Sequence, residues 1–571
     1  MSRTAPPAMS MAETHARLTA PDSAFAIERR VIDGVSQRCW VHTPTTARQL
    51  LIDAAAHDAR DFLIFEDERV SVCAFRKAVS ALAHHLRDGG VRPGDRIAIA
   101  MRNLPEWPVV FFAALSIGAI ATALNAWWQH AELAYAMEQS GATHLFADAE
   151  RLDRLGTLPG GVRCYAVRGA MPGATSLTDI IGTIAQWNAL PNRPLPAVSL
   201  DADDAATIFF TSGTSGKPKG VLASHRAILN NITGAAFAGA RASLRDRGTL
   251  PVAGSDAAQG GALMAVPFFH VTGAFAVLSP ALHAGNKLVL THRWDAGEAL
   301  RLIERERLNW VIGVPTMMLQ LADHPDAATR DLTSLVSLGY GGAAAAPDLV
   351  DRLTSVVPTA VPGHGWGMTE TCGLTLTHSG NDYRRRPTSC GAPVAVARAE
   401  VRGEDGRRIL PADQVGELWV SGPNVMRGYW NDPAATAAVL QGGWLRTGDL
   451  ARIDAEGFVH IVDRAKDIVI RGGENVFCIE VENCLYEHPA VQDAALVGRP
   501  DRMLGEVPVA VVVLRDSVAA SSEQLRAHVA ARLAAFKVPV EVVLSSTPLP
   551  RNAAGKLLKR DILAALGQRE G

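Results

Sequence analysis

Residues 211–220, with the sequence Thr-Ser-Gly-Thr-Ser-Gly-Lys-Pro-Lys-Gly, have the composition of a loop that holds phosphate. Hydroxyl groups and glycines let side-chain O–H and backbone N–H groups converge on anionic oxygens without interference from Cβ atoms, and the lysines add positive charge. The predicted phosphate-contacting residues are Thr211, Ser212, Gly213, Thr214, Ser215, Gly216, Lys217 and Lys219. A flexible surface loop is the alternative interpretation.

The spacing of this loop differs from that of a Walker loop, which has four residues between its first glycine and the Gly-Lys pair. Here only two residues separate Gly213 from Gly216, and Pro218 stands where a Walker loop has Ser or Thr. The loop follows an apolar run at 206–210 and precedes a helix-like segment at 224–236. It is therefore predicted to connect a strand to a helix in a different nucleotide-binding family.

The segment 211–220 resembles the signature of the adenylate-forming enzymes, the superfamily of acyl-CoA synthetases, peptide-synthetase adenylation domains and luciferases. The resemblance covers roughly residues 45–565. It continues in the order of that family at 267–273, 363–371, 444–449, 463–467, 471–475 and 550–556. Within the superfamily, the stretches at 125–128 and 424–430 look most like bacterial fatty-acid–CoA ligases.

The bulk composition disfavours several classes of protein. Lys and Arg number 56 against 58 Asp and Glu, a net charge of −2, so nothing favours nucleic acid or an anionic membrane as a partner. The seven cysteines contain no Cys-x-x-Cys pair and are expected as buried thiols in a reducing compartment, hence a cytoplasmic protein. Residues 1–20 have no apolar core, and the apolar run at 109–124 is too short for a membrane span, so it is predicted to be a buried helix.

The predicted fold class is α/β, with a large N-terminal domain of stacked β/α subdomains and a small mobile C-terminal α+β domain. Residues 1–45 are predicted to be a loosely ordered lead-in, 46–465 the AMP-binding domain, and 466–571 the C-terminal lid, with a hinge at Lys466. The segment 241–261, rich in Gly, Ala and charge, is expected to be an exposed loop, and Ser521 with Gln524 a capping box that begins a helix.

The resemblance implies catalytic roles for Lys556, Thr369 and Glu370. Lys556 would bridge the attacking carboxylate and the α-phosphate of ATP, which stabilises charge that develops in the transition state. Glu370 would bind Mg²⁺, a hard cation that takes oxygen ligands, and Thr369 would contact the α-phosphate. Without the resemblance, Glu370 is more typical of a solvated loop acid and Lys556 of a surface lysine.

The resemblance also assigns the AMP site. Trp366 stands where the family has a tyrosine that stacks on adenine, and an indole can do the same. Asp449 would accept both ribose hydroxyls, and Arg464 would reach the ribose or the phosphates. Small or neighbouring residues would pass close to the nucleotide and the acyl carboxylate: Gly341, Gly342, Ala343, Gly367 and Met368.

Short-chain members of the family have a tryptophan at the position that Gly367 occupies, so the resemblance implies an open acyl pocket. Apolar or small residues are expected to form the wall of this pocket, and two further glycines to line a tunnel for the pantetheine thiol. They are Phe269, His270, Thr272, Gly273 and Gly365 for the wall, and Gly472 and Gly473 for the tunnel. A structural histidine is the alternative for His270.

These implications predict an ATP-dependent carboxylic acid–CoA ligase that forms an acyl adenylate and then an acyl-CoA, with Mg²⁺ as cofactor and ATP and CoA as co-substrates. A medium- to long-chain fatty acid is the favoured substrate, and a bulky aryl-alkanoic, aromatic or steroid-type acid is the alternative. An enzyme that forms an adenylate and loads a carrier protein is a competing function, as is a binding protein without chemistry. Composition does not fix the oligomeric state, and a homodimer stays open.

Overall fold

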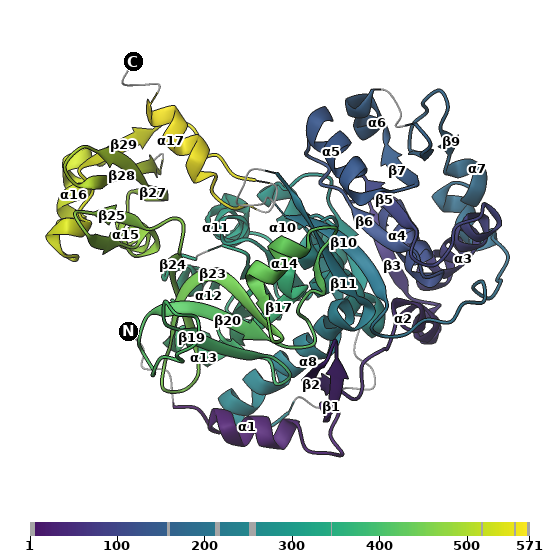
Figure 1. Cartoon of the computed structure of the whole chain (residues 1–571), viewed down its shortest axis with the longest axis horizontal. Helices are drawn as coiled ribbons and strands as arrows, with labels where there is room; N and C mark the ends of the chain where they lie inside the picture. Colours follow the sequence, from purple (N-terminus) through teal and green to yellow (C-terminus); the bar gives the residue numbers. More distant parts are fainter. Residues whose placement is uncertain are drawn as a thin grey trace.

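The computed structural model describes residues 6–156, 160–211, 217–250, 259–343, 345–515, 518–552 and 555–567. A large N-terminal part is built on two sheets with helices around them, and a small C-terminal part stands beside it (Figure 1). The predicted α/β class, with a large and a small domain, is confirmed. None of the helices in the described ranges is both long enough and apolar enough to cross a membrane.

Two large sheets form the N-terminal part. The first has the strand order β21 (Gly428–Tyr429), β11 (Lys219–Ser224), β10 (Ala205–Thr211), β6 (Ile120–Ala123), β5 (Arg96–Ala100), β7 (His144–Asp148), β8 (Arg163–Val167), β9 (Thr175–Ser176). The second has the order β18 (Ala392–Pro393), β17 (Gly373–Ser379), β16 (Val361–Met368), β15 (Ser337–Gly341), β14 (Trp310–Gly313), β12 (Gly261–Met264), β13 (Lys287–Leu290), β3 (Asp61–Phe65), β4 (Glu68–Ser71). Both are parallel at the centre, so their carboxyl ends can gather ligands.

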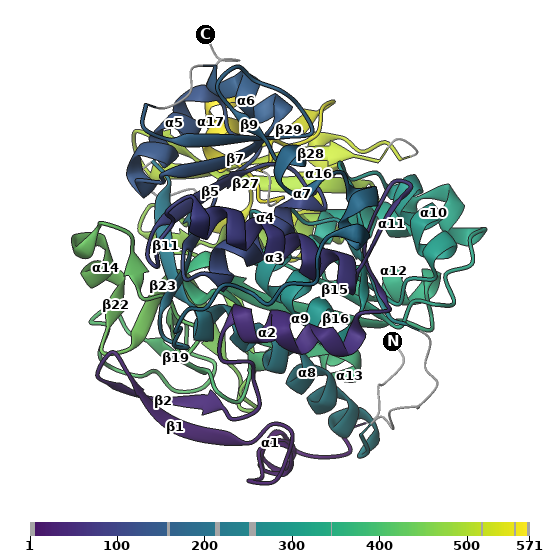
Figure 2. The same ribbon diagram turned by 90° about the vertical axis from the view of Figure 1, so that its right-hand side faces the viewer.

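Helices pack against these sheets, as Figure 2 shows for α3 and α4. In the order of the chain the N-terminal part contains α1 (Met11–Leu18), α2 (Ala47–Asp53), α3 (Val72–Asp88), α4 (Glu106–Ser116), α5 (His130–Ser140), α6 (Ala149–Leu155), α7 (Thr178–Ile181), α8 (His225–Arg247), α9 (Ser279–Ala284), α10 (Ala296–Glu306), α11 (Pro315–Asp323), α12 (Leu349–Val356), α13 (Gly380–Arg385) and α14 (Pro433–Val439). Every residue of α4 is buried. The apolar run at 109–124 is thus a buried helix only as far as Ser116, because a turn at Gly118 (φ +80°) leads directly into β6.

Two smaller sheets follow. The first contains β19 (Arg398–Arg402), β20 (Gly416–Ser421), β23 (Trp444–Ile453), β22 (Leu440–Gln441) and β24 (Val459–Arg464). The C-terminal sheet contains β26 (Glu474–Val476), β25 (Val469–Arg471), β28 (Gly505–Leu514), β27 (Val491–Asp501) and β29 (Glu541–Ser545), with helices α15 (Cys478–Tyr486), α16 (Ser522–Ala530) and α17 (Lys559–Gly567). The capping box is confirmed, since the Gln524 N–H donates to Ser521 and the Ser521 N–H donates to Gln524.

Two predictions about loops are wrong. The segment 211–220 connects β10 to β11, an antiparallel pair, and α8 begins only after β11, so it joins two strands. The predicted loop at 241–261 is helical at its start, because α8 continues to Arg247. Its charged side chains give the sequence a loop-like character, but Arg241 and Arg245 are buried, and Arg245 pairs with Asp382 (Nη2–Oδ1 2.8 Å).

The N-terminal lead-in is also more ordered than predicted. It contains helix α1 and the hairpin of β1 (Ile27–Ile32) and β2 (Val35–Trp40). Leu18 and Trp40 are buried in one cluster with Phe237 of α8, and α1 lies against α8 (Figures 1 and 2). Buried apolar surface from distant segments orders this stretch, which has no periodicity of its own.

Candidate active site

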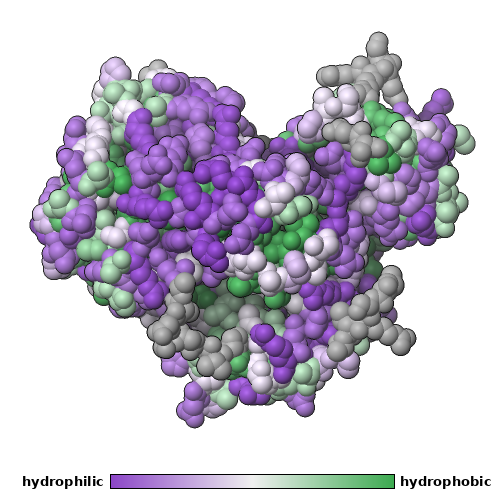
Figure 3. Space-filling model, turned by 180° about the vertical axis from the view of Figure 1, so that it is seen from behind, coloured by the Kyte–Doolittle hydropathy of each residue, from purple (hydrophilic) through white to green (hydrophobic). Residues whose placement is uncertain are grey.

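A cavity of about 1100 Å³ lies between the N-terminal and C-terminal parts. Its lining includes predicted site residues from five separate motifs: Gly342 and Ala343; Gly365, Trp366, Gly367 and Met368; Asp449; Arg464 and Lys466; and Lys556. In the view from behind, a notch separates the C-terminal lobe from the rest of a mostly hydrophilic surface (Figure 3). Residues from distant parts of the sequence therefore meet around one hollow.

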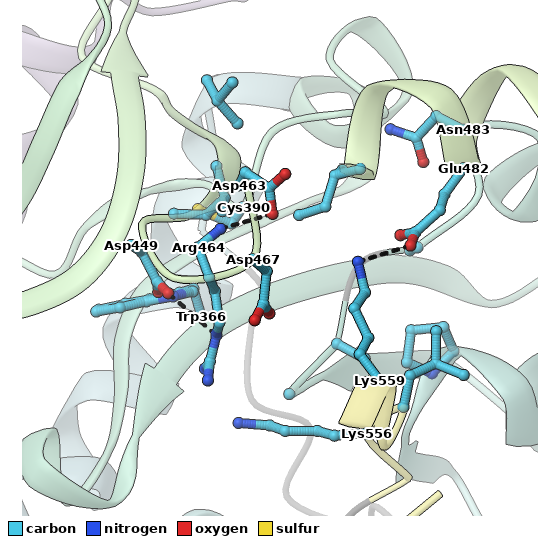
Figure 4. Close-up of a pocket in the computed structure, with 18 of the residues that line it drawn as sticks. Trp366, Cys390, Asp449, Asp463, Arg464, Asp467, Glu482, Asn483, Lys556 and Lys559 are labelled. Atoms are coloured by element: carbon cyan, nitrogen blue, oxygen red, sulfur yellow. Dashed lines mark hydrogen bonds and ion pairs between the residues drawn. The ribbon is translucent and has the colours of Figure 1, made fainter. Parts of the chain in front are cut away.

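Asp449 is the centre of a polar group on one wall of the cavity (Figure 4). It lies on β23 directly opposite Arg464 of the antiparallel strand β24. Its Oδ1 is 3.3 Å from the Arg464 Nε, and its Oδ2 accepts a hydrogen bond of 2.9 Å from the indole Nε1–H of Trp366, on β16. Asp449 is 5 % exposed, so the two donors hold a largely buried carboxylate in one orientation at the edge of the cavity.

Lys556 comes from the C-terminal part, in the loop between β29 and α17, and it lines the same cavity (Figure 4). Burial lowers the pKa of its ammonium group to about 8, and the positive charge of Arg464 contributes to the decrease, while Asp449 and Glu370 oppose it. The negative charges of Asp449 and Glu370 therefore both act on the pKa of Lys556. A partly desolvated ammonium group is suited to an anionic substrate.

Glu370 lies in a short turn, Thr369–Thr371, directly after β16. It is 7 % exposed, and its Oε1 accepts a hydrogen bond of 2.8 Å from the hydroxyl of Tyr429 on β21. Burial, followed by the charge of Glu370, raises the pKa of Tyr429. Sequence reasoning did not assign Tyr429, although it lies in the motif at 424–430.

The ends of the predicted phosphate loop are described, and one of them lies beside the ring of Tyr429. Thr211 is the last residue of β10, and the ammonium group of Lys219, at the start of β11, lies 5.0 Å from the ring centre of Tyr429. Lys217 lies 5.4 Å from the ring centre of Tyr135. The predicted phosphate contacts at Ser212, Gly213, Thr214, Ser215 and Gly216 lie outside the described residues. Lys219 and Glu370 are thus connected through the ring and the hydroxyl of Tyr429.

The glycines beside Trp366 are required by close packing of the backbone. A Cβ atom on Gly341 would lie 2.4 Å from the carbonyl oxygen of Gly365, and one on Gly367 would lie 1.7 Å from that of Gly373. Most of the motif at 363–371 is the strand β16 itself. The backbone of the neighbouring strand therefore requires glycine at position 367, whatever the size of the acyl group.

The predicted residues of the acyl pocket are only partly brought together. Gly365 lines the cavity, whereas the described residues at 269–273 do not. Phe269 is 3 % exposed, and a Cβ on Gly273 would lie 2.2 Å from the Pro267 carbonyl oxygen. Thr272 begins the turn of helix that ends at Leu278 and is half-buried.

His270 is close enough to Lys556 to respond to its charge. The pKa of His270 falls to about 4, first because of burial and then because of Lys556, and its Nε2 is a buried atom with no hydrogen-bond partner among the described residues. Gly472 and Gly473 form the turn between β25 and β26 with φ of +60° and +90°, values that favour glycine. This turn is not part of the cavity lining.

Comparisons with known proteins agree with this arrangement. The sequence profile described as "AMP-binding enzyme" matches residues 51–430, and that of the "AMP-binding enzyme C-terminal domain" matches 480–556. The chain therefore belongs to the AMP-binding enzyme family, and the resemblance to adenylate-forming enzymes is confirmed.

Individual relatives cover nearly the whole chain. A feruloyl-CoA synthase of Amycolatopsis sp is 35 % identical over 86 % of this chain and 93 % of its own. A long-chain-fatty-acid–CoA ligase of Bacillus subtilis is 31 % identical over 91 % of this chain and 94 % of its own. The solved structure of the o-succinylbenzoate CoA synthetase of Bacillus subtilis, in complex with its acyl-adenylate intermediate, is similar to this chain with a TM-score of 0.73. The two are 28 % identical, and the match covers 90 % of this chain and 97 % of that one.

Proposed function

We propose that this AMP-forming acid–CoA ligase joins a bulky, apolar carboxylic acid to CoA through an acyl adenylate. The observation that carries the proposal is the convergence of Lys556 and Asp449 on one cavity between the two parts of the chain, with Glu370 close enough to act on the charge of Lys556. A lysine, a buried carboxylate beside an indole, and a second carboxylate near the phosphate loop are groups that suit adenylation of a carboxylic acid.

In the first step, a carboxylate oxygen attacks the α-phosphorus of ATP, and pyrophosphate leaves. Trp366 provides a ring face for adenine, and Asp449 accepts hydrogen bonds from the ribose. The ammonium group of Lys556 would lie between the carboxylate and the α-phosphate, where negative charge accumulates in the transition state. Thr369 and residues 211–219 hold the phosphates.

The residues around Glu370 fit a magnesium ion. Its carboxylate and the neighbouring Thr369 hydroxyl are oxygen donors, and Mg²⁺ is usually held by one or two carboxylates together with the substrate phosphates. Glu370 is largely buried, and the Tyr429 hydroxyl engages one of its carboxylate oxygens. When bound there, the ion would neutralise phosphate charge.

In the second step, the CoA thiol attacks the acyl carbonyl carbon, and AMP leaves with the bonding electrons. Lys556 is not needed here. We infer that the C-terminal part turns about Lys466, which removes Lys556 from the cavity and brings Gly472 and Gly473 toward the acyl adenylate. The glycines would let the pantetheine pass close to the backbone.

The acid is inferred from the relatives. The feruloyl-CoA synthase has the higher identity of the two ligases and favours an aryl-substituted acid. The Bacillus ligase aligns over more of the chain and favours a fatty acid as the second candidate. Measuring kcat/KM for CoA-dependent AMP release over ferulic, coumaric, benzoic, octanoic and palmitic acids separates the two. A preference for ferulic or coumaric acid supports the first candidate, and a preference for the fatty acids replaces it with the second.

A further inference from the structure

Arg551 attaches the loop that carries Lys556 to the body of the C-terminal part. Its Nη2 donates to both oxygens of Asp493 on β27, at 2.8 and 2.9 Å. Its Nη1 donates to the carbonyl oxygen of Gly555, at 2.7 Å. The guanidinium group therefore spans the gap between a strand of the C-terminal sheet and the residue immediately before Lys556.

Hydrogen bonds join the described residues on the two sides of this loop. The Lys556 N–H donates to Asn552 Oδ1 (3.0 Å), the Asn552 N–H donates to the Lys556 carbonyl (2.9 Å), and the Leu558 N–H donates to the Pro550 carbonyl (2.9 Å). These bonds fix the backbone of Lys556 relative to its own loop. The direction of the whole loop then depends on its attachment through Arg551.

Asp493 is suited to serve as the fixed end of this attachment. Its Oδ1 also accepts hydrogen bonds from the Tyr486 hydroxyl (2.7 Å) and the Ala494 N–H (3.0 Å). The side chains of Arg551 and Asp493 are 19 % and 16 % exposed. Because the pair is mostly desolvated and the arginine contacts both carboxylate oxygens, its geometry is well defined.

The other side of the loop rests on the N-terminal part. A Cβ atom on Gly555 (φ +74°) would lie 2.8 Å from Cγ2 of Val314, the residue before α11. The loop thus has little space to shift toward the N-terminal part, and on the other side Arg551 holds it to Asp493.

We propose that Arg551, paired with Asp493, is a positioning residue that sets Lys556 in the cavity for adenylate formation and has no role in thioester formation. This inference rests on the proposed function. Lysine cannot replace Arg551, because one ammonium group cannot reproduce the guanidinium contacts to a carboxylate together with a further one to a carbonyl. Small displacements of a catalytic group reduce its step without abolishing the fold.

The test measures the two half-reactions separately in Arg551→Lys and Asp493→Asn. Adenylation is followed by pyrophosphate–ATP exchange, and thioester formation by CoA consumption with a supplied acyl adenylate. We expect adenylation to fall about 10- to 100-fold, with thioester formation within about twofold of wild type. In a Lys556→Ala background, Arg551→Lys is expected to cause no further loss of adenylation, because both changes remove the same contribution.

Glu541→Gln is the matched control. It breaks an ion pair of 2.7 Å between Glu541 and Arg499, which joins β27 to β29 outside the loop that carries Lys556. Both half-reactions should stay at the wild-type rate. Equal losses in both half-reactions of Arg551→Lys, or a further loss in the Lys556→Ala background, would overturn the positioning role. A wild-type protein that exchanges pyrophosphate with none of the acids would instead contradict the proposed function.

Discussion

The indole N–H of Trp366 donates a 2.9 Å hydrogen bond to Oδ2 of Asp449, so the residue proposed to stack on adenine also orients the residue proposed to bind ribose. Arg464 lies against the other carboxylate oxygen. Each carboxylate oxygen of Asp449 thus has one protein partner before ATP binds, and these two partners fix the orientation of the carboxylate.

Replacing Trp366 by Phe keeps an aromatic face and removes the N–H. A hydrogen bond to a charged acceptor contributes about 1.5–3 kcal/mol, so kcat/KM for ATP should fall by roughly tenfold or more. Preference for ATP over 2′-deoxy-ATP should fall as well, because the ribose contact becomes less rigid. Steady-state kinetics with both nucleotides measure this.

Trp294→Phe is the control for this change. It removes a hydrogen bond of 2.7 Å from the indole N–H of Trp294 to Oε1 of Gln320. Both residues lie outside the cavity lining. Unchanged nucleotide preference in Trp366→Phe, or an equal change in Trp294→Phe, would argue against the orienting role.

The pH dependence of adenylation should reflect Lys556. Its pKa is lowered to about 8, so the ammonium form is present below that pH and is lost as the pH rises through it. We expect kcat/KM for adenylation to decline above pH 8, because the neutral amine cannot stabilise the developing charge. Lys556→Ala should lose this limb along with most of its rate. A decline that persists unchanged in Lys556→Ala would assign it to another group.

The hinge can be tested with Lys466→Pro. Proline fixes φ near −65° and also restricts the preceding residue, which opposes rotation of the chain at this point. The substitution should spare pyrophosphate exchange and slow thioester formation by roughly tenfold or more. Lys466→Ala is the matched control, because it removes the same side chain and leaves φ unrestricted. Equal loss in both half-reactions of Lys466→Pro would reject the hinge.

Stability should depend on a buried pair that is not part of the cavity lining. Arg245 is completely buried and bonded to Asp382, so Arg245→Met leaves a buried carboxylate with a weaker set of partners. The free energy of unfolding should fall by about 3 kcal/mol, as it does when one partner of a buried pair is removed. Arg30→Met, which breaks an exposed pair with Glu28, should have a negligible effect. Denaturant titration of both variants checks the difference, and a loss below about 1 kcal/mol for Arg245→Met would contradict a stabilising role for the pair.

The resemblance to a known family predicts part of the site. It assigns roles to Asp449, Arg464 and Lys556, which by residue type alone look like ordinary solvated charges, and the structure brings them to one cavity. The capping box at Ser521 is likewise predictable, because both of its partners lie within one helical turn.

Features that depend on contacts between distant segments have no such local signal. The charges of Arg241 and Arg245 suggest a loop because their buried partners lie 136 and 137 positions away. The pairing of Arg551 with Asp493 spans 58 positions. For Gly367, the sequence suggests that glycine keeps the acyl pocket open. The structure shows instead that a Cβ atom at this position would meet the backbone of Gly373 on the neighbouring strand β17.

Two half-reactions are proposed to share this cavity, and AMP release with and without CoA tests that claim most directly. Purified protein is incubated with ATP, Mg²⁺ and each acid of the panel, and AMP is measured over many turnovers. We predict pyrophosphate exchange that needs only the acid, and sustained AMP release that needs CoA as well. Sustained AMP release that ignores CoA, or acyl transfer only to a carrier protein, would contradict the shared cavity.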